Sequence, residues 1–130
     1  MLVLDASGAV ELLLNTAAGK RVAKRVENPA VSIHVPHLID VEIAHVLRRY
    51  ALHGTLSSTR GALALDQWRA LDVERYSHEL FLDRIWQLRD NVSAYDAVYV
   101  SLAEALGAVL VTGDGRLLGA PGLRTRIELA

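Results

Sequence analysis

Short apolar runs along this chain predict its strands. Leu2–Leu4 and residues 108–112 are apolar over nearly their whole length, and residues 31–35 alternate and include β-branched side chains. Runs of this length and composition are typical of strands in a buried sheet. Residues 123–129 alternate between apolar and polar side chains, which predicts a further strand at an edge of the sheet.

Helical patterns fill most of the remaining chain. Apolar residues recur at three- and four-residue spacings, while serine, proline, asparagine and glycine mark the ends of the segments. Ser7 is predicted to cap the first helix and Gly107 to end the last one. The predicted helices cover residues 9–14, 20–26, 37–53, 57–71, 78–89 and 93–106.

Strands that alternate with helices predict an α/β fold. A run of helices lies between the second and third predicted strands, and no repeat or linker divides the chain. We therefore expect one domain over residues 1–130, with three layers in which a central, mostly parallel sheet is flanked by helices on both faces.

Composition narrows the possible functions. The 130 residues are 52% hydrophobic with a formal net charge of −1, which indicates a folded domain without a broad basic face. Any contact with nucleic acid must therefore be local or be supplemented by metal. The absence of cysteine excludes disulfides and thiolate metal sites. The chain has no basic leader and no long uncharged apolar run, so we expect a cytoplasmic protein without membrane contact.

Four acidic residues stand in apolar or turn-forming surroundings. Asp5 and Asp114 each follow a predicted strand, so both should lie at the carboxyl edge of the sheet. Asp96 falls in the first turn of the helix before the last of these strands, and Glu42 lies about one turn into its helix on an apolar stripe. Four converging carboxylates repel one another unless a cation lies between them. Mg²⁺ or Mn²⁺ suits such oxygen ligands, which predicts a metal-dependent nuclease.

Each acid also has a structural interpretation when it is taken alone. Asp5 and Asp96 suit helix-capping positions, and Glu42 suits a half-exposed helix surface. Asp114 lies between two glycines, where aspartate is a common turn former. Only their joint placement favours the catalytic interpretation.

Five segments form a specific pattern when they are taken together: residues 3–7 (Val-Leu-Asp-Ala-Ser), 36–49, 94–99 (Ala-Tyr-Asp-Ala-Val-Tyr), 103–108 and 110–117 (Leu-Val-Thr-Gly-Asp-Gly-Arg-Leu). With this pattern the chain resembles PIN-domain proteins over nearly its whole length, specifically the VapC-type toxin ribonucleases of type II toxin–antitoxin systems. The resemblance implies that the catalytic acids and metal ligands are Asp5, Glu42, Asp96 and Asp114. It also implies supporting hydroxyls at Ser7 and Thr112.

The resemblance further implies an activity and partners. The expected activity is a magnesium-dependent endoribonuclease, with Mn²⁺ as an alternative ion, that cleaves a structured RNA such as tRNA or rRNA. The expected partners are a second copy in a homodimer and a cognate VapB-type antitoxin, which blocks the site and joins the toxin in operator-bound complexes. The aromatic residues of the middle helices are interpreted as core, but any that are exposed would contact the antitoxin: Trp68, Tyr76, Phe81 and Trp86.

Of three polar residues near the acids, two keep two interpretations each and the third has one. His45 stands where the family commonly has asparagine, so it either orients Glu42, a water or RNA, or belongs to the core. Arg116 either meets a phosphate oxygen or pairs with a nearby carboxylate. Asp40 should point away from Glu42 into solvent.

Other functional classes fit the residues less well. A receiver-type phosphotransfer module needs a lysine near its last strands, but the only lysines are Lys20 and Lys24. A haloacid-dehalogenase-like phosphatase needs a second aspartate where Ser7 stands. A catalytically inactive PIN-like binding scaffold remains the main alternative, and the four intact acids argue against it.

Overall fold

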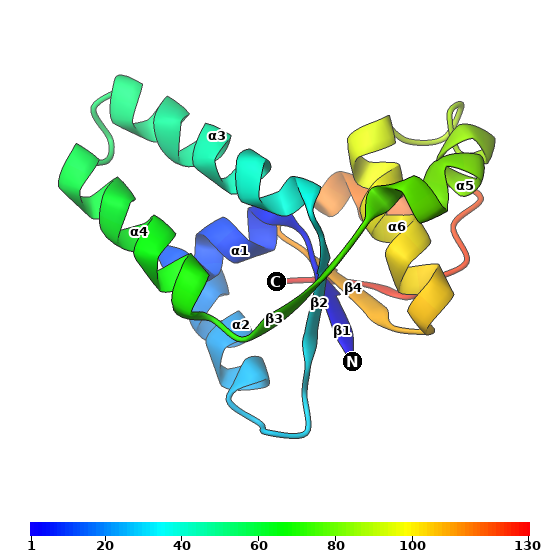
Figure 1. Ribbon diagram of the computed structural model, residues 1–130, viewed down its shortest axis with the longest axis horizontal. Helices are drawn as coiled ribbons and strands as arrows, with labels where there is room; N and C mark the ends of the chain where they lie inside the picture. The colour runs from blue at the N-terminus through cyan, green and yellow to red at the C-terminus, as the bar shows by residue number, and fades with distance from the viewer.

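Five parallel strands form the central sheet of the structure, a computed structural model that describes residues 1–130 (Figure 1). The strands are β1 (Leu2–Leu4), β2 (Ile33–Pro36), β3 (Val73–Tyr76), β4 (Val109–Thr112) and β5 (Ile127–Leu129), in the order β3-β2-β1-β4-β5. The central strand β1 is the most apolar, and all three of its residues are at most 1% exposed. Strands buried on both faces need such continuous apolar runs.

Helices cover both faces of this sheet. The α-helices are α1 (Ala6–Leu13), α2 (Ala17–Val26), α3 (Leu38–Leu52), α4 (Ser58–Ala70), α5 (Leu82–Gln87) and α6 (Ala94–Leu106), with short 3₁₀ helices η1 (His78–Phe81) and η2 (Gly115–Gly119). In Figure 1, α1 to α4 lie to one side of the sheet, and α5 and α6 lie to the other. The prediction of a three-layer α/β domain with a parallel sheet is confirmed.

Helix α6 lies against the middle of the sheet. It contacts β1, β2 and β4, and its residues from Ala97 to Ala103 are all buried. Gly107 ends the helix in the left-handed conformation (φ +62°), as the sequence predicts. Because α6 is anchored along most of its length, its first turn has a fixed position beside the carboxyl ends of the strands.

Strand β3 was not predicted. We expected only helices between the second and third predicted strands, and this expectation is wrong. Val73–Tyr76 pairs in parallel with β2 and forms an edge of the sheet. Its four residues include the charged Glu74 and Arg75, both exposed. A short edge strand needs no continuous apolar run, so its sequence carries little signal.

Two helix predictions also differ from the structure. The first helix begins at Ala6, so Ser7 lies inside it and Asp5 is the N-cap, whose side chain accepts a hydrogen bond from the backbone of Gly8. The single helix predicted over residues 78–89 is instead η1 followed by α5. No helix in the fold combines the length and the apolar character needed to cross a bilayer.

The close approach of α1 and α2 depends on Gly19. A Cβ atom there would lie 1.8 Å from the carbonyl oxygen of Glu11 and 2.9 Å from the backbone nitrogen of Leu12. Both neighbours are backbone atoms, so a side chain at this position would force the two helices apart.

We therefore predict that Gly19→Ala destabilises the fold by about 1–3 kcal/mol or more, since this is the usual cost of overpacking. Helix propensity alone predicts the opposite, a gain of about 1 kcal/mol. Thermal unfolding followed by circular dichroism distinguishes the two. Gly119→Ala is the matched control, because nothing lies within 4 Å of a Cβ there. A melting temperature that rises in Gly19→Ala would contradict this packing argument.

Candidate active site

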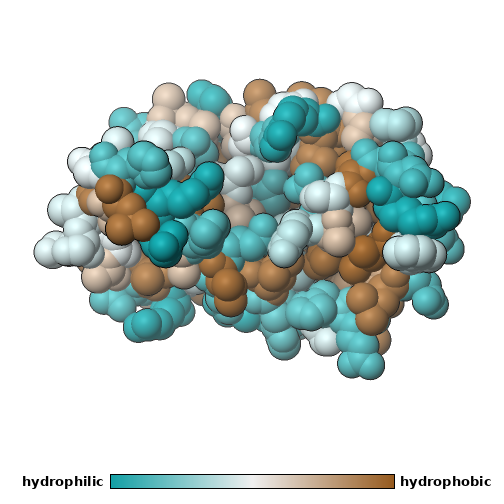
Figure 2. All heavy atoms as spheres, turned by 90° about the horizontal axis from the view of Figure 1, so that it is seen from above, coloured by the Kyte–Doolittle hydropathy of each residue, from teal (hydrophilic) through white to brown (hydrophobic).

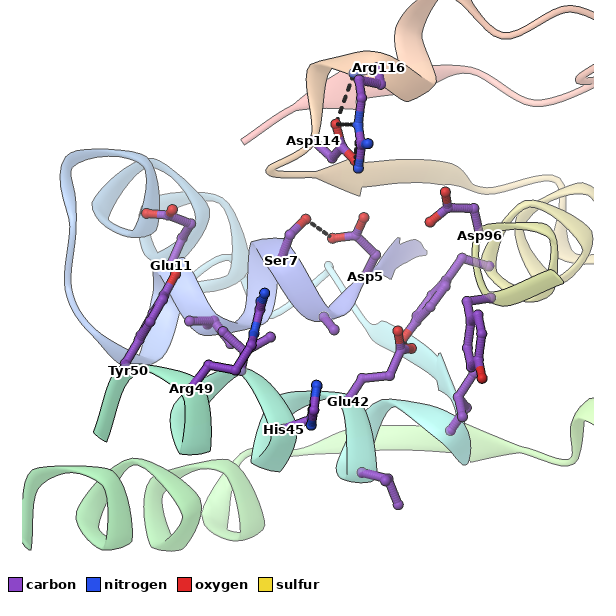
Figure 3. A pocket seen from close by; sticks show the side chains of 17 residues that line it. Asp5, Ser7, Glu11, Glu42, His45, Arg49, Tyr50, Asp96, Asp114 and Arg116 are labelled. Carbon is purple, nitrogen blue, oxygen red and sulfur yellow. Dashed lines mark hydrogen bonds and ion pairs between the residues drawn. The ribbon is translucent and has the colours of Figure 1, made fainter. Parts of the chain in front are cut away.

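All four acids singled out from the sequence line one pocket of about 700 Å³ at the carboxyl edge of the sheet. Asp5 follows β1, Asp114 follows β4, Asp96 lies in the first turn of α6, and Glu42 lies on α3. Figure 3 shows Asp5, Asp96 and Asp114 on one side of the pocket and Glu42 pointing toward them from the other. Figure 2, which looks down on this edge, shows a hollow near its middle with hydrophilic residues among hydrophobic patches.

Asp5 is the most buried of the four, with 6% of its surface exposed. Its carboxylate accepts hydrogen bonds from the Ser7 hydroxyl at 2.6 Å, from the backbone of Gly8 at 2.9 Å and from the Thr112 hydroxyl. Burial raises the pKa of Asp5, although these donors stabilise the ionised form. The buried carboxylate is therefore fixed in orientation before any ligand arrives.

The same two hydroxyls join β1 to the loop after β4. Ser7 Oγ accepts a hydrogen bond from the backbone of Gly113 at 2.8 Å, and Thr112 Oγ1 accepts one from the backbone of Asp114 at 2.9 Å. Each hydroxyl thus donates to Asp5 and accepts from the segment that carries Asp114. The hydroxyls expected at Ser7 and Thr112 therefore lie beside the acids and set their relative positions.

Glu42 is held by a residue that the sequence analysis missed. The Tyr99 hydroxyl donates to Glu42 Oε1 at 2.5 Å, and Tyr99 is only 2% exposed. Burial and the neighbouring Glu42 raise the pKa of Tyr99, so its hydroxyl keeps its proton. Tyr99 lies three residues after Asp96 on α6, and residues at this spacing share a helix face. That spacing was the signal available in the sequence.

Repulsion among the acids contributes to the shifts of their pKa values. Burial raises the pKa of Glu42, and the like charges of Asp5 and Asp96 raise it further. Burial also raises the pKa of Asp96, with Asp5 and Asp114 adding to the effect. Asp114 differs, because its hydrogen bonds with Arg116 lower its pKa. Three of the four acids therefore lack a counterion, and the fourth has one.

The other polar residues of the region divide between the pocket and the helix surface. His45 is exposed and lines the pocket together with Arg49, so the core interpretation of His45 is wrong. Asp40 points away from the pocket as expected, but it is not free in solvent. It accepts hydrogen bonds from Trp68 Nε1 at 2.6 Å and from the guanidinium of Arg75.

The donor set of the pocket is suited to a hard divalent ion. As the side chains stand, no group of three or more His, Asp or Glu residues is arranged to hold one ion together. Mg²⁺, however, usually keeps several waters and takes only one or two carboxylates directly. This pocket of about 700 Å³ is lined by five carboxylates, the four acids above and Glu11, so it has the oxygen ligands and the room for a hydrated ion.

Several known proteins are similar to this chain in sequence or in fold. Residues 2–123 match the family model described as PIN domain. "VapC ribonuclease Mb0985" of Mycobacterium bovis is 48% identical over 117 residues, which cover 90% of this chain and 88% of that protein. "Ribonuclease VapC1" of Mycobacterium tuberculosis is 41% identical over 128 residues, with 98% and 96% covered. The solved structure of DNA-bound VapBC from Salmonella typhimurium shares the fold, with a TM-score of 0.72 at 17% identity over 98% of this chain and 96% of that one.

The uncompensated charge of Glu42 leads to a stability prediction for metal-free protein. The pKa of Glu42 in the fold lies above its ordinary value of 4.5, so folding favours the protonated carboxyl. The stability that Glu42 contributes at low pH is therefore lost as the pH rises through the folded pKa. Glu42→Gln keeps an acceptor for Tyr99 and should raise the melting temperature at pH 7, measured by calorimetry with a chelator. The gain should vanish below about pH 4.5, where the carboxyl is protonated in both states.

Asp114→Asn is the matched comparison for Glu42→Gln. It removes the charge that pairs with Arg116 rather than an unpaired one, so it should leave the melting temperature unchanged or lower it. Equal stabilisation by both substitutions would show that the ion pair does not distinguish Asp114 from the other acids.

Removal of the Tyr99 hydroxyl should act on Glu42. Tyr99→Phe keeps the ring but loses the donor that favours the ionised carboxylate, so the pKa of Glu42 should rise further. Carbon-detected NMR titration of the Glu42 carboxyl measures this shift. Tyr50→Phe is the control, because no hydrogen bond joins the Tyr50 hydroxyl to Glu42. An unchanged Glu42 titration in Tyr99→Phe would remove Tyr99 from the site.

Proposed function

Because this chain belongs to the PIN domain family, with VapC ribonucleases among its relatives, we propose that it is the endoribonuclease toxin of a VapBC-type pair, dependent on a divalent metal ion. The observation that carries the proposal is the convergence of four carboxylates from four separate segments on one pocket. Clustered acids without counterions are costly in a fold, which favours a functional reason for keeping them.

In this proposal Asp5, Glu42, Asp96 and Asp114 hold Mg²⁺, with Mn²⁺ as an alternative. Such an ion, when bound, supplies Lewis acidity to activate water and neutralises charge on the phosphodiester. Ser7 and Thr112 keep Asp5 oriented, and they fix the spacing between Asp5 and the segment after β4.

The remaining pocket residues act on the substrate and on Glu42. The hydrogen bond from Tyr99 favours the ionised form of Glu42 and aims its side chain into the pocket. His45 and Arg49 are exposed in the same pocket, one and two helical turns beyond the first turn of α3, where they can donate hydrogen bonds to phosphate oxygens. The net charge of −1 leaves the chain without a broad basic face, so in this proposal RNA binding depends on local donors such as His45 and Arg49. A structured RNA such as tRNA or rRNA is the proposed substrate class.

The proposed partners are a cognate VapB-type antitoxin and a second copy of the chain. The similarity in fold to the Salmonella typhimurium VapBC supports the first. Exposed apolar side chains support the presence of a protein interface. Trp68 is buried as expected, but Trp86 is 68% exposed, and the core interpretation of Trp86 is wrong. Leu80 and Leu82 nearby in η1 and α5 are 77% and 56% exposed. Exposed aromatic and aliphatic side chains of this kind are enriched at interfaces.

Substitution of Asp5 and of Asp96 tests the proposed activity. Asp5→Asn and Asp96→Asn should each lower RNA cleavage by about 100-fold or more, because losing a metal ligand removes several kcal/mol of transition-state stabilisation. Cleavage is measured with purified protein in Mg²⁺ or Mn²⁺ and again with a chelator. Asp66→Asn is the matched control, an aspartate of α4 outside the pocket.

Two results would contradict this proposal. Full activity of Asp5→Asn would exclude Asp5 from the chemistry. Wild-type protein that neither cleaves RNA nor binds a divalent ion would favour the inactive scaffold instead.

A further inference from the structure

Asp114 is the only acid of the pocket that forms an ion pair. Arg116 Nε lies 3.0 Å from each carboxylate oxygen of Asp114, and Arg116 Nη2 lies 2.7 Å from Oδ2. The backbone nitrogen of Arg116 also donates to Oδ1 at 3.0 Å. No ion pair is formed by the other four acids that line the pocket, Asp5, Glu11, Glu42 and Asp96 (Figure 3).

These contacts occupy most of the carboxylate. The backbone nitrogen and Nε of Arg116 contact Oδ1, and Nε and Nη2 contact Oδ2, so three donor groups meet a carboxylate that offers about four lone-pair sites. While Arg116 holds this position, Asp114 keeps at most one site for a further ligand. An ion can therefore use both oxygens of Asp114 only after the guanidinium has moved.

Arg116 is free to make this movement. Its side chain is 89% exposed, and its only side-chain hydrogen bonds are those to Asp114. Exposed ion pairs are weak, so a divalent ion can displace the guanidinium. Arg116 lines the same pocket as the four acids, and its charge also acts on Asp96. A displaced Arg116 thus remains at the mouth of the pocket with its donors unused.

We propose that Arg116 is an internal counterion that competes with the divalent ion for Asp114 and, once displaced, binds a phosphate of the RNA. This inference rests on the proposed function, since it assumes that the pocket takes both a metal ion and RNA. It gives the site two states: one in which the guanidinium neutralises Asp114, and one in which the metal does so and the guanidinium meets the substrate. Guanidinium groups form paired hydrogen bonds with carboxylates and with phosphates alike.

Mn²⁺ binding by isothermal titration calorimetry tests the competition without any measurement of activity. Arg116→Ala should bind Mn²⁺ about two- to fivefold more tightly than the wild type, the range expected from release of an exposed ion pair. In an Asp114→Asn background, Arg116→Ala should have no such effect, because there is no carboxylate left to release.

The matched control is Arg69→Ala. Arg69 also forms an exposed ion pair with a nearby aspartate, Asp66, but lies outside the pocket. It should leave the Mn²⁺ affinity unchanged. Tighter binding by Arg116→Ala that persists in the Asp114→Asn background would reflect charge alone and would overturn the competition.

The phosphate contact is tested with a defined structured RNA that the wild type cleaves, at saturating Mn²⁺. Arg116→Ala should raise KM by about fivefold, with a smaller change in kcat. An unchanged KM would overturn the substrate role. Wild-type protein that binds no Mn²⁺ would overturn the proposed function and this inference together. If the wild type binds Mn²⁺ and Arg116→Ala binds it with the same affinity, the inference alone is overturned.

Discussion

Negative charge concentrated at the carboxyl edge of a parallel sheet is the constraint on which the rest of the structure depends. Strands β1 and β4 are neighbours in register, with Leu4 opposite Val111, so the segments carrying Asp5 and Asp114 must emerge side by side. Helix α6 is buried from Ala97 to Ala103, which fixes Asp96 beside them, and α3 brings Glu42 from the opposite side. The fold therefore cannot separate these charges. It can only compensate for them through individual contacts or through a bound cation.

The four acids are compensated in different ways, and this division suggests their roles. Asp5 is buried and held by two hydroxyls and a backbone amide, which suits a fixed ligand. Glu42 depends on one buried hydroxyl, that of Tyr99. Asp96 lies beside Ser93, the N-cap of its helix, whose hydroxyl accepts a hydrogen bond from the Asp96 backbone nitrogen, and it has no cation of its own. Asp114 alone is neutralised, by an exposed guanidinium. The pocket thus combines a buried acid that is held by three donors, Asp5, with a half-buried acid that is paired with an exposed guanidinium, Asp114.

Much of this arrangement could be predicted from the sequence, and the parts that could not share a physical reason. Asp5 and Asp114 follow apolar strands, and residues in those positions lie at one edge of any parallel sheet. Strand β3 was missed because an edge strand needs no apolar run, and Tyr99 because a buried tyrosine in an apolar helix looks like core. The partners of Asp40, on α4 and β3, depend on contacts between segments 28 and 35 residues apart along the chain. Sequence patterns describe each segment well, but such pairings arise only from packing.

The central claim is that these acids share a divalent ion, and their own titration tests it most directly. Carbon-detected NMR can follow each carboxyl of the folded protein with and without Mg²⁺. A bound cation favours the ionised form, so Mg²⁺ should lower the pKa of Asp5, Glu42 and Asp96 together. Glu104, which is paired with Arg84 outside the pocket, should titrate as before. Titration curves of the three acids that do not move at saturating Mg²⁺ would contradict the account.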